Sequence, residues 1–188
     1  MTKLLIKRFI KDYENTQNSD VRTAYGKFSS IVGIVCNAIL FISKLIVGTL
    51  SASVSITADA VNNLSDASSS IISLLGFKLA SRPADEEHPY GHGRYEYLSG
   101  LMVAVLIMVI GVELFKSSLD KVLHPSAVEF SWITVGVLAF SILLKTWMAL
   151  FNTKTGKMIN SNTLIATAAD SRNDVITTGA VLLSLIHI

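Results

Sequence analysis

Two pairs of polar residues stand four positions apart within otherwise apolar stretches: Asn62 with Asp66, and Asp170 with Asp174. An α-helix places residues i and i+4 on one face, one turn apart, so each pair presents its oxygen atoms on one side of a helix. An ionisable side chain at membrane depth is costly unless it is paired or faces water, which makes it a functional candidate. Two such faces turned toward each other would offer up to four oxygen ligands. The pattern predicts a site for a divalent metal ion.

The composition places these pairs in a membrane protein. The chain has 188 residues, of which 51% are hydrophobic and 16% are charged, whereas roughly 25% of the residues of a soluble domain are charged. Its mean hydropathy is +0.52. The single cysteine, Cys36, excludes disulfides within the chain and clusters of thiolate ligands. No His-Glu-x-x-His motif and no Ser/His pair lies in a long apolar stretch, so nothing indicates an intramembrane enzyme.

Five apolar stretches are long enough to cross the ~30 Å hydrocarbon core, which needs about 20 helical residues. They cover residues 29–50, 53–80, 97–119, 131–152 and 162–186. We therefore expect an all-α membrane protein, a transmembrane helical bundle over residues 29–186, after a cytoplasmic N-terminal segment of residues 1–28. The second and fifth stretches carry the two pairs and are rich in Ser, Thr and Ala. Small side chains allow helices to approach closely, so we expect these two inside the bundle and the other three facing lipid.

The positive charges predict the orientation. Eleven of the 16 lysines and arginines fall in the N-terminal segment and in the second and fourth connections, whereas the opposite side has only Lys116 and Lys121. Cytoplasmic segments are enriched in Lys and Arg, so we expect a cytoplasmic N-terminus. Lys44 and Lys145 lie within a few turns of a predicted helix end, and we expect both to extend toward that end. Arg172 lies between the two aspartates but about 100° per residue away, so we expect it to pair elsewhere.

Three segments of the chain resemble sequence motifs of the cation diffusion facilitators. They are ADAVNNLSD at residues 58–66, RPADEEHPYGHGRYE at residues 82–96 and DSRND at residues 170–174. The first and third resemble the metal motifs of the family's second and fifth helices, and the middle one resembles the loop between helices two and three. The resemblance runs from about residue 27 to residue 185. Three motifs in the right order make the resemblance specific.

The resemblance implies a fold and a function. Members of this family are built from six-helix protomers, usually homodimers, with a cytoplasmic C-terminal metal-binding domain. They export divalent metals from the cytoplasm in exchange for protons. The chain ends at residue 188, where the predicted fifth helix ends. We therefore expect a truncated member that lacks the sixth helix and the C-terminal domain, and a homodimer when the protein is full length.

The resemblance also assigns ligands and suggests a metal. It implies that Asn62 and Asp66 form the first ligand pair of the transport site and that Asp170 and Asp174 form the second. Zinc-type members typically carry a histidine in the fifth-helix pair, whereas this set is similar to the manganese-exporting bacterial branch. Carboxylate and amide oxygens suit Mn²⁺ and imidazole suits Zn²⁺, so the chemistry favours the same metal. Asp59 lies two turns before Asp66 and is a candidate to support the ligands or to bind the metal.

The loop between the second and third predicted helices offers a second candidate metal site. Asp85, His88 and His92 provide three ligands of the kind that zinc-like ions accept. The alternative is a solvated cytoplasmic loop whose turns are shaped by proline and glycine. The residues alone leave both interpretations open.

The leading hypothesis is a cation:proton antiporter of the bacterial plasma membrane that exports Mn²⁺ and is not an enzyme. Its expected partners are metal ions, protons, lipid and a second protomer, with no nucleic acid and no cofactor besides the transported ion. Export of Zn²⁺, Fe²⁺ or Co²⁺ is the alternative within this class. A passive cation channel, which would need acidic residues along one pore, and an inactive truncated fragment are alternatives from other classes. Polar residues that only join helices by hydrogen bonds are the structural alternative.

Overall fold

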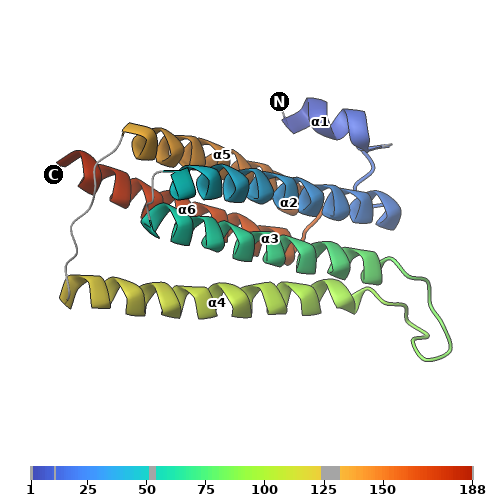
Figure 1. Ribbon diagram of the computed structural model, residues 1–188. Helices are drawn as coiled ribbons and strands as arrows, with labels where there is room; N and C mark the ends of the chain where they lie inside the picture. The colour runs from blue at the N-terminus through green and yellow to red at the C-terminus, as the bar shows by residue number, and fades with distance from the viewer. Residues whose placement is uncertain (1, 11, 51–53, 124–131, 188) are drawn as a thin grey trace.

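The chain is mostly helical in the part that the computed structural model describes, which is residues 2–10, 12–50, 54–123 and 132–187. The helices of this part follow one another as Figure 1 shows. They are α1 (Thr2–Phe9), α2 (Ser19–Leu50), α3 (Val54–Ala80), α4 (Arg94–Leu123), α5 (Trp132–Met158) and α6 (Asn162–His187). No strand occurs within these described residues, and the predicted all-α class is confirmed.

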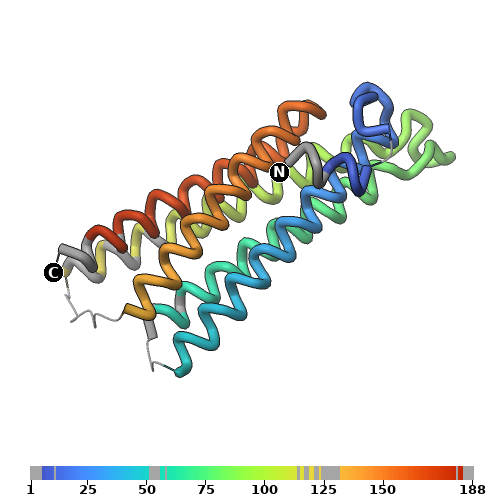
Figure 2. The backbone as a smooth tube through the Cα atoms, turned by 90° about the horizontal axis from the view of Figure 1, so that it is seen from above, coloured from blue at the N-terminus to red at the C-terminus, as the bar shows by residue number. Residues whose placement is uncertain are grey.

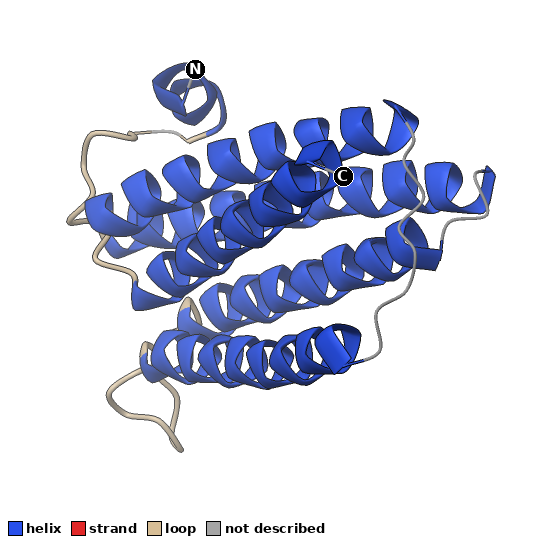
Figure 3. Cartoon of the chain, turned by 90° about the vertical axis from the view of Figure 1, so that its left-hand side faces the viewer, coloured by secondary structure: helices blue, strands red, loops and turns tan. Residues whose placement is uncertain are grey.

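The five long helices lie side by side in one bundle (Figures 1 and 2). The most extensive packing joins α2 to α3 and α5 to α6. α3 also packs against α4 and α6, and α6 also packs against α4, so these two helices contact the largest number of neighbours. Their position fits their small polar residues, which allow helices to approach closely. The loops that the structure describes gather at one end of the bundle, the end that carries α1 (Figure 3).

Large apolar side chains cover the outer surface of the bundle. α4 exposes Leu101, Met102, Val105 and Met108, and other exposed Leu, Ile and Val residues lie along α2 and α5. Among the described residues, three stretches are long and apolar enough to cross a membrane: Ser19–Leu50, Arg94–Glu113 and Trp132–Met158. α3 and α6 are less apolar because they carry the polar pairs, although α3 has the same 27-residue length as α5. Five spans therefore remain a prediction.

Several helices extend beyond the apolar stretches at the end with the described loops. α2 begins at Ser19, not near residue 29, and α5 ends at Met158, not near residue 152. Asn18 caps α2, since its side-chain Oδ1 accepts a hydrogen bond of 2.8 Å from the backbone N–H of Asp20. Hydropathy detects only the part of a helix inside the bilayer, so these polar extensions were missed. The predicted starts at residues 53 and 131 lie outside the described residues.

The N-terminal segment is more ordered than its basic composition suggests. α1 is a short amphipathic helix, and Ile6 and the following Ile10 are buried against Tyr25, Phe77 and Leu164. The Tyr25 hydroxyl donates a hydrogen bond of 2.8 Å to the carbonyl oxygen of Tyr13. The segment therefore packs on the end of the bundle.

Candidate metal-binding site

The two predicted pairs face each other where α3 meets α6. One carboxylate oxygen from each of Asp66, Asp170 and Asp174 lies within 4.8 Å of the other two. Asp66 is buried, and Asp170 and Asp174 are half-buried. Asn62 is half-buried one turn before Asp66 on the same face of α3. The structure therefore brings together the three carboxylates that the spacing had pointed to, with the amide one turn away.

A lysine from a third helix reaches into this cluster. Lys145 Nζ lies 2.6 Å from Asp66 Oδ2 and 2.7 Å from Asp174 Oδ2. The side chain of Lys145 is buried, so the prediction that it extends to a helix end is wrong. The physical reason is its position: it lies 13 residues from each end of α5 and cannot reach water in either direction. A buried ammonium requires compensating charge, and the two carboxylates supply it.

Lys44 on α2 repeats this arrangement with a different partner. Its Nζ lies 2.8 Å from Asp59 Oδ2, and its side chain is only 2% exposed. Lys44 lies only six residues before the end of α2 at Leu50, but its ion pair with Asp59 keeps it buried, so the prediction that it extends toward a helix end is wrong. Asp59 thus pairs with a lysine and is not a member of the three-carboxylate cluster. Arg172 is exposed on α6, outside the cluster.

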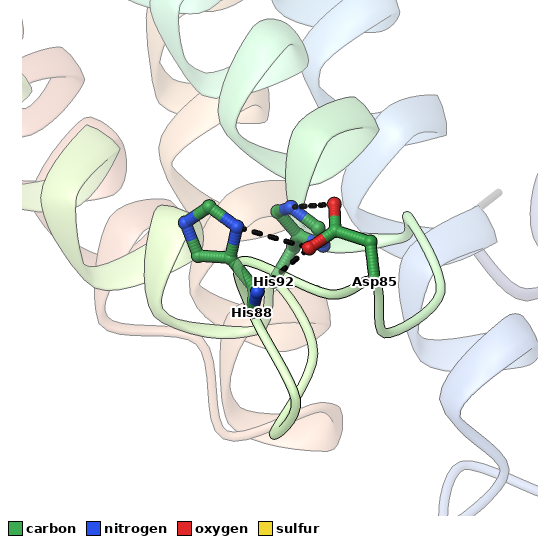
Figure 4. Close-up of side chains that lie close together, drawn as sticks. All are labelled: Asp85, His88 and His92. Carbon is green, nitrogen blue, oxygen red and sulfur yellow. Dashed lines mark hydrogen bonds and ion pairs between the residues drawn. The ribbon is translucent and has the colours of Figure 1, made fainter.

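The second candidate site also assembles, in the loop before α4. Oxygen and nitrogen atoms of Asp85, His88 and His92 lie within 4.8 Å of one another (Figure 4). His88 Nδ1 is 3.2 Å from Asp85 Oδ1, and His92 Nε2 is 3.3 Å from Asp85 Oδ2. His92 Nδ1 lies 3.0 Å from the carbonyl oxygen of Pro83. That carbonyl can only accept, so Nδ1 is the donor to it and Nε2 is the ring nitrogen that faces Asp85.

The loop also favours the ionised form of its carboxylate. The backbone N–H of His88 donates a hydrogen bond of 2.7 Å to Asp85 Oδ1. This bond is the main cause that lowers the pKa of Asp85 below its ordinary value. Gly91 has a φ of 77° and makes the turn between the two histidines. The loop therefore holds the three side chains in a defined arrangement.

Both clusters lie in the part of the chain that matches a known protein family. Residues 30–188 match the family described as the cation efflux transmembrane domain. The chain belongs to the cation efflux family. The resemblance to the cation diffusion facilitators is thus confirmed, and with it the assignment to integral membrane proteins.

Relatives of this cation efflux protein come from archaea, bacteria and plants. It is 36% identical over 156 residues to an uncharacterised transporter of Methanocaldococcus jannaschii, covering 83% of this chain and 55% of the relative. It is 31% identical over 149 residues to the manganese efflux system protein MneS of Bacillus subtilis, covering 79% and 51%. It is 26% identical over 158 residues to the manganese efflux system protein MneP of the same organism, covering 84% and 52%. The chain spans about half the length of these curated relatives.

A network of one ion pair and two hydrogen bonds connects helix ends near the loop site. The sequence analysis did not predict it. Arg22 on α2 forms an ion pair of 2.8 Å with Glu96 on α4. The Nε–H of Arg22 also donates a hydrogen bond of 2.8 Å to the carbonyl oxygen of Ile159, between α5 and α6. The Thr163 hydroxyl donates to the carbonyl oxygen of Glu96 at 3.0 Å. Partners 67 or more residues apart in sequence leave no local pattern, so no motif could have indicated this network.

Proposed function

We propose that this protein takes part in the efflux of a divalent metal cation, Mn²⁺ in the first place, with Asn62, Asp66, Asp170 and Asp174 as the transport site. It acts as a secondary transporter that exchanges the metal for protons. The observation that carries the proposal is the convergence of three carboxylates from α3 and α6 inside an apolar bundle. Charged groups at such depth mark ion pathways far more often than structural joints.

The donor atoms support manganese. The cluster contains only carboxylates, and carboxylate, carbonyl and water oxygens suit Mn²⁺ better than imidazole or thiolate does. Two of the relatives are named as manganese efflux proteins. Intrinsic affinity rises from Mn²⁺ through Fe²⁺ and Co²⁺ and is higher again for Zn²⁺, so any preference for manganese must come from geometry and availability. Zn²⁺, Fe²⁺ and Co²⁺ are therefore the alternative cargoes.

The charges of the cluster fit a divalent cation. The three carboxylates and the ammonium of Lys145 together carry a formal charge of two negative units, which one divalent cation neutralises. Protons and metal ions compete for the same carboxylate oxygens, so exchange needs no separate proton site. Alternating access of this site to the two sides would move the metal one way and protons the other. A cluster of this kind fits a bound ion better than the acidic ring of a passive channel.

We assign the protein to the bacterial plasma membrane with a cytoplasmic N-terminus, and to a homodimer in its full-length form. The loop site of Asp85, His88 and His92 would bind metal on the cytoplasmic side, where it could collect or sense the ion before transport. Its two imidazoles favour zinc-like ions over manganese.

The metal assignment can be tested by competition. The purified chain is equilibrated with equimolar Mn²⁺ and Zn²⁺, and the bound metals are counted with His88→Ala and His92→Ala in place, so that only the bundle site contributes. We expect mainly manganese. Adding Asp170→His supplies the imidazole that zinc prefers and should shift the ratio of bound zinc to manganese by about tenfold or more. An unchanged ratio would show that the donor types of this site do not set the choice.

The orientation can be tested by chemical labelling. Single cysteines at Glu86 and at Asp120, in a background without Cys36, are exposed to an impermeant thiol reagent in intact cells. Because cytoplasmic segments are enriched in Lys and Arg, position 120 should react and position 86 should react only after the cells are opened. The reverse pattern would overturn the orientation and the inference of export. Cys36 itself is buried, so its removal clears the background without touching the surface.

A further inference from the structure

Lys145 is a buried lysine of the bundle. It lies at the middle of α5, and its ammonium bridges carboxylates from two other helices. The side chains of Lys145 and Asp66 are each only 4% exposed. A lysine ammonium is a compact charge with three donors on a flexible four-carbon stem, so it can move without any change in the backbone. The two ion pairs are thus short and charged, while the flexible side chain allows the ammonium to change its position.

The ammonium holds the same atoms that a metal ion would need. Divalent ions of this kind bind carboxylate oxygens at about 2.0–2.2 Å. Lys145 Nζ is 2.6 Å from Asp66 Oδ2 and 2.7 Å from Asp174 Oδ2. A metal ion bound to both oxygens would overlap the position of Nζ, and the two positive charges would repel each other at that distance. The ammonium and the metal ion therefore exclude each other from this position.

We propose that Lys145 is an internal, covalently tethered cation that competes with the transported metal ion for Asp66 Oδ2 and Asp174 Oδ2. The competition weakens metal binding and promotes release of the metal, because the ammonium compensates the two carboxylates as soon as the metal departs. A secondary transporter needs a site that the ion can leave as well as enter, and Lys145 supplies that condition. The inference rests on the proposed function of the three carboxylates.

A purely structural role for Lys145 makes the opposite prediction for affinity. If the ion pairs only join α5 to α3 and α6, their loss would disorder the site and weaken metal binding. If Lys145 is a competitor, its loss would leave the carboxylates uncompensated, destabilise the metal-free protein and strengthen metal binding. The sign of the change in affinity therefore separates the two roles.

The experiment measures Mn²⁺ affinity in the 188-residue chain reconstituted in lipid nanodiscs. All forms carry His88→Ala and His92→Ala, so that the loop site does not contribute. Free Mn²⁺ is measured from its electron paramagnetic resonance signal. For Lys145→Met we expect a Kd lower by about tenfold or more, since one repelling charge has gone. For Lys145→Arg, which keeps the charge, we expect a Kd within about threefold of the parent.

Lys44→Met is the matched control, because it also removes a buried lysine from an ion pair with an aspartate. Its partner Asp59 lies outside the three-carboxylate cluster. We expect Lys44→Met to lower the thermal stability of the metal-free protein but to change the Kd by less than about threefold. If Lys145→Met is too unstable to reconstitute, Lys145→Gln replaces it, since it removes the charge and keeps a donor.

Two results would overturn the proposal: a folded Lys145→Met or Lys145→Gln protein that binds Mn²⁺ no more tightly than the parent, or a Lys145→Arg protein that binds as tightly as the methionine variant. Failure of the proposed function looks different. In that case the parent form binds no stoichiometric Mn²⁺, or binds it equally well when Asp174 is replaced, whatever stands at position 145.

Discussion

Asp174→Asn is expected to lower the affinity of the bundle site for Mn²⁺ by at least about 100-fold, since it removes a full negative charge from a largely buried site. The substitution keeps the shape of the side chain, so the loss reports charge and not packing. It also leaves the ammonium of Lys145 with Asp66 as its remaining ion-pair partner among the described residues. Calorimetric titration of the purified protein with Mn²⁺ measures the change directly.

Two comparison variants test whether the loss of affinity is specific to a charged ligand of the site. Glu113→Gln removes a carboxylate that is exposed on α4, and Mn²⁺ affinity should remain within about threefold of the parent. Asn62→Ala removes a neutral oxygen and should weaken binding much less than Asp174→Asn does. Stoichiometric binding of near-parental affinity in Asp174→Asn would show that the metal does not bind between α3 and α6.

Gly76→Val is expected to disrupt the packing of α3 against α4. A Cβ atom at Gly76 would overlap both the Cβ and the Oγ of Ser99, a buried residue of α4. The short serine side chain has little room to move, and its hydroxyl donates a hydrogen bond of 2.8 Å to the carbonyl oxygen of Glu96. Overpacking of this kind costs about 1–3 kcal/mol, and more where the backbone must shift. Thermal unfolding in detergent should show a clear fall in Tm.

Gly111→Val provides the matched control for this prediction. The substitution is the same, but a Cβ atom at Gly111 of α4 meets no atom within 4 Å. We expect its Tm to remain close to that of the parent, since valine is also a better helix former than glycine. Equal losses in the two variants would mean that lipid contact, and not the close approach of α3 to α4, decides the stability.

The core of the candidate site could be predicted from the sequence because its signal is local. Asp170 and Asp174 lie one helical turn apart, and Asn62 and Asp66 repeat that spacing in another apolar stretch. Both features are visible without knowledge of the fold. The Ser- and Ala-rich composition of α3 and α6 also predicted that these helices lie inside the bundle. The loop triad followed in the same way from the short spacing of Asp85, His88 and His92.

The partner of each buried lysine could not be predicted, because it depends on the packing of helices that are distant in sequence. Lys145 is 79 residues from Asp66 and reaches it only when α5 packs against α6 and α2. The apolar stretch also ended too early, which placed Lys145 closer to a helix end than it is. α1 escaped detection for a similar reason, since Ile6 becomes a core residue only after it packs on Tyr25 and its neighbours.

The bundle divides into two tightly packed hairpins, α2 with α3 and α5 with α6, while α3 and α6 contact each other only sparsely. Asp66 belongs to the first hairpin, and Asp170, Asp174 and Lys145 belong to the second. The ligands therefore come from two hairpins, which α4 and the contact of α2 with α5 also connect, and a shear motion of packed helices would change the distances between the ligands. A displacement of a few ångströms between the hairpins would separate Asp66 from Asp174. The same division of the ligands that forms the binding site would then also release the ion.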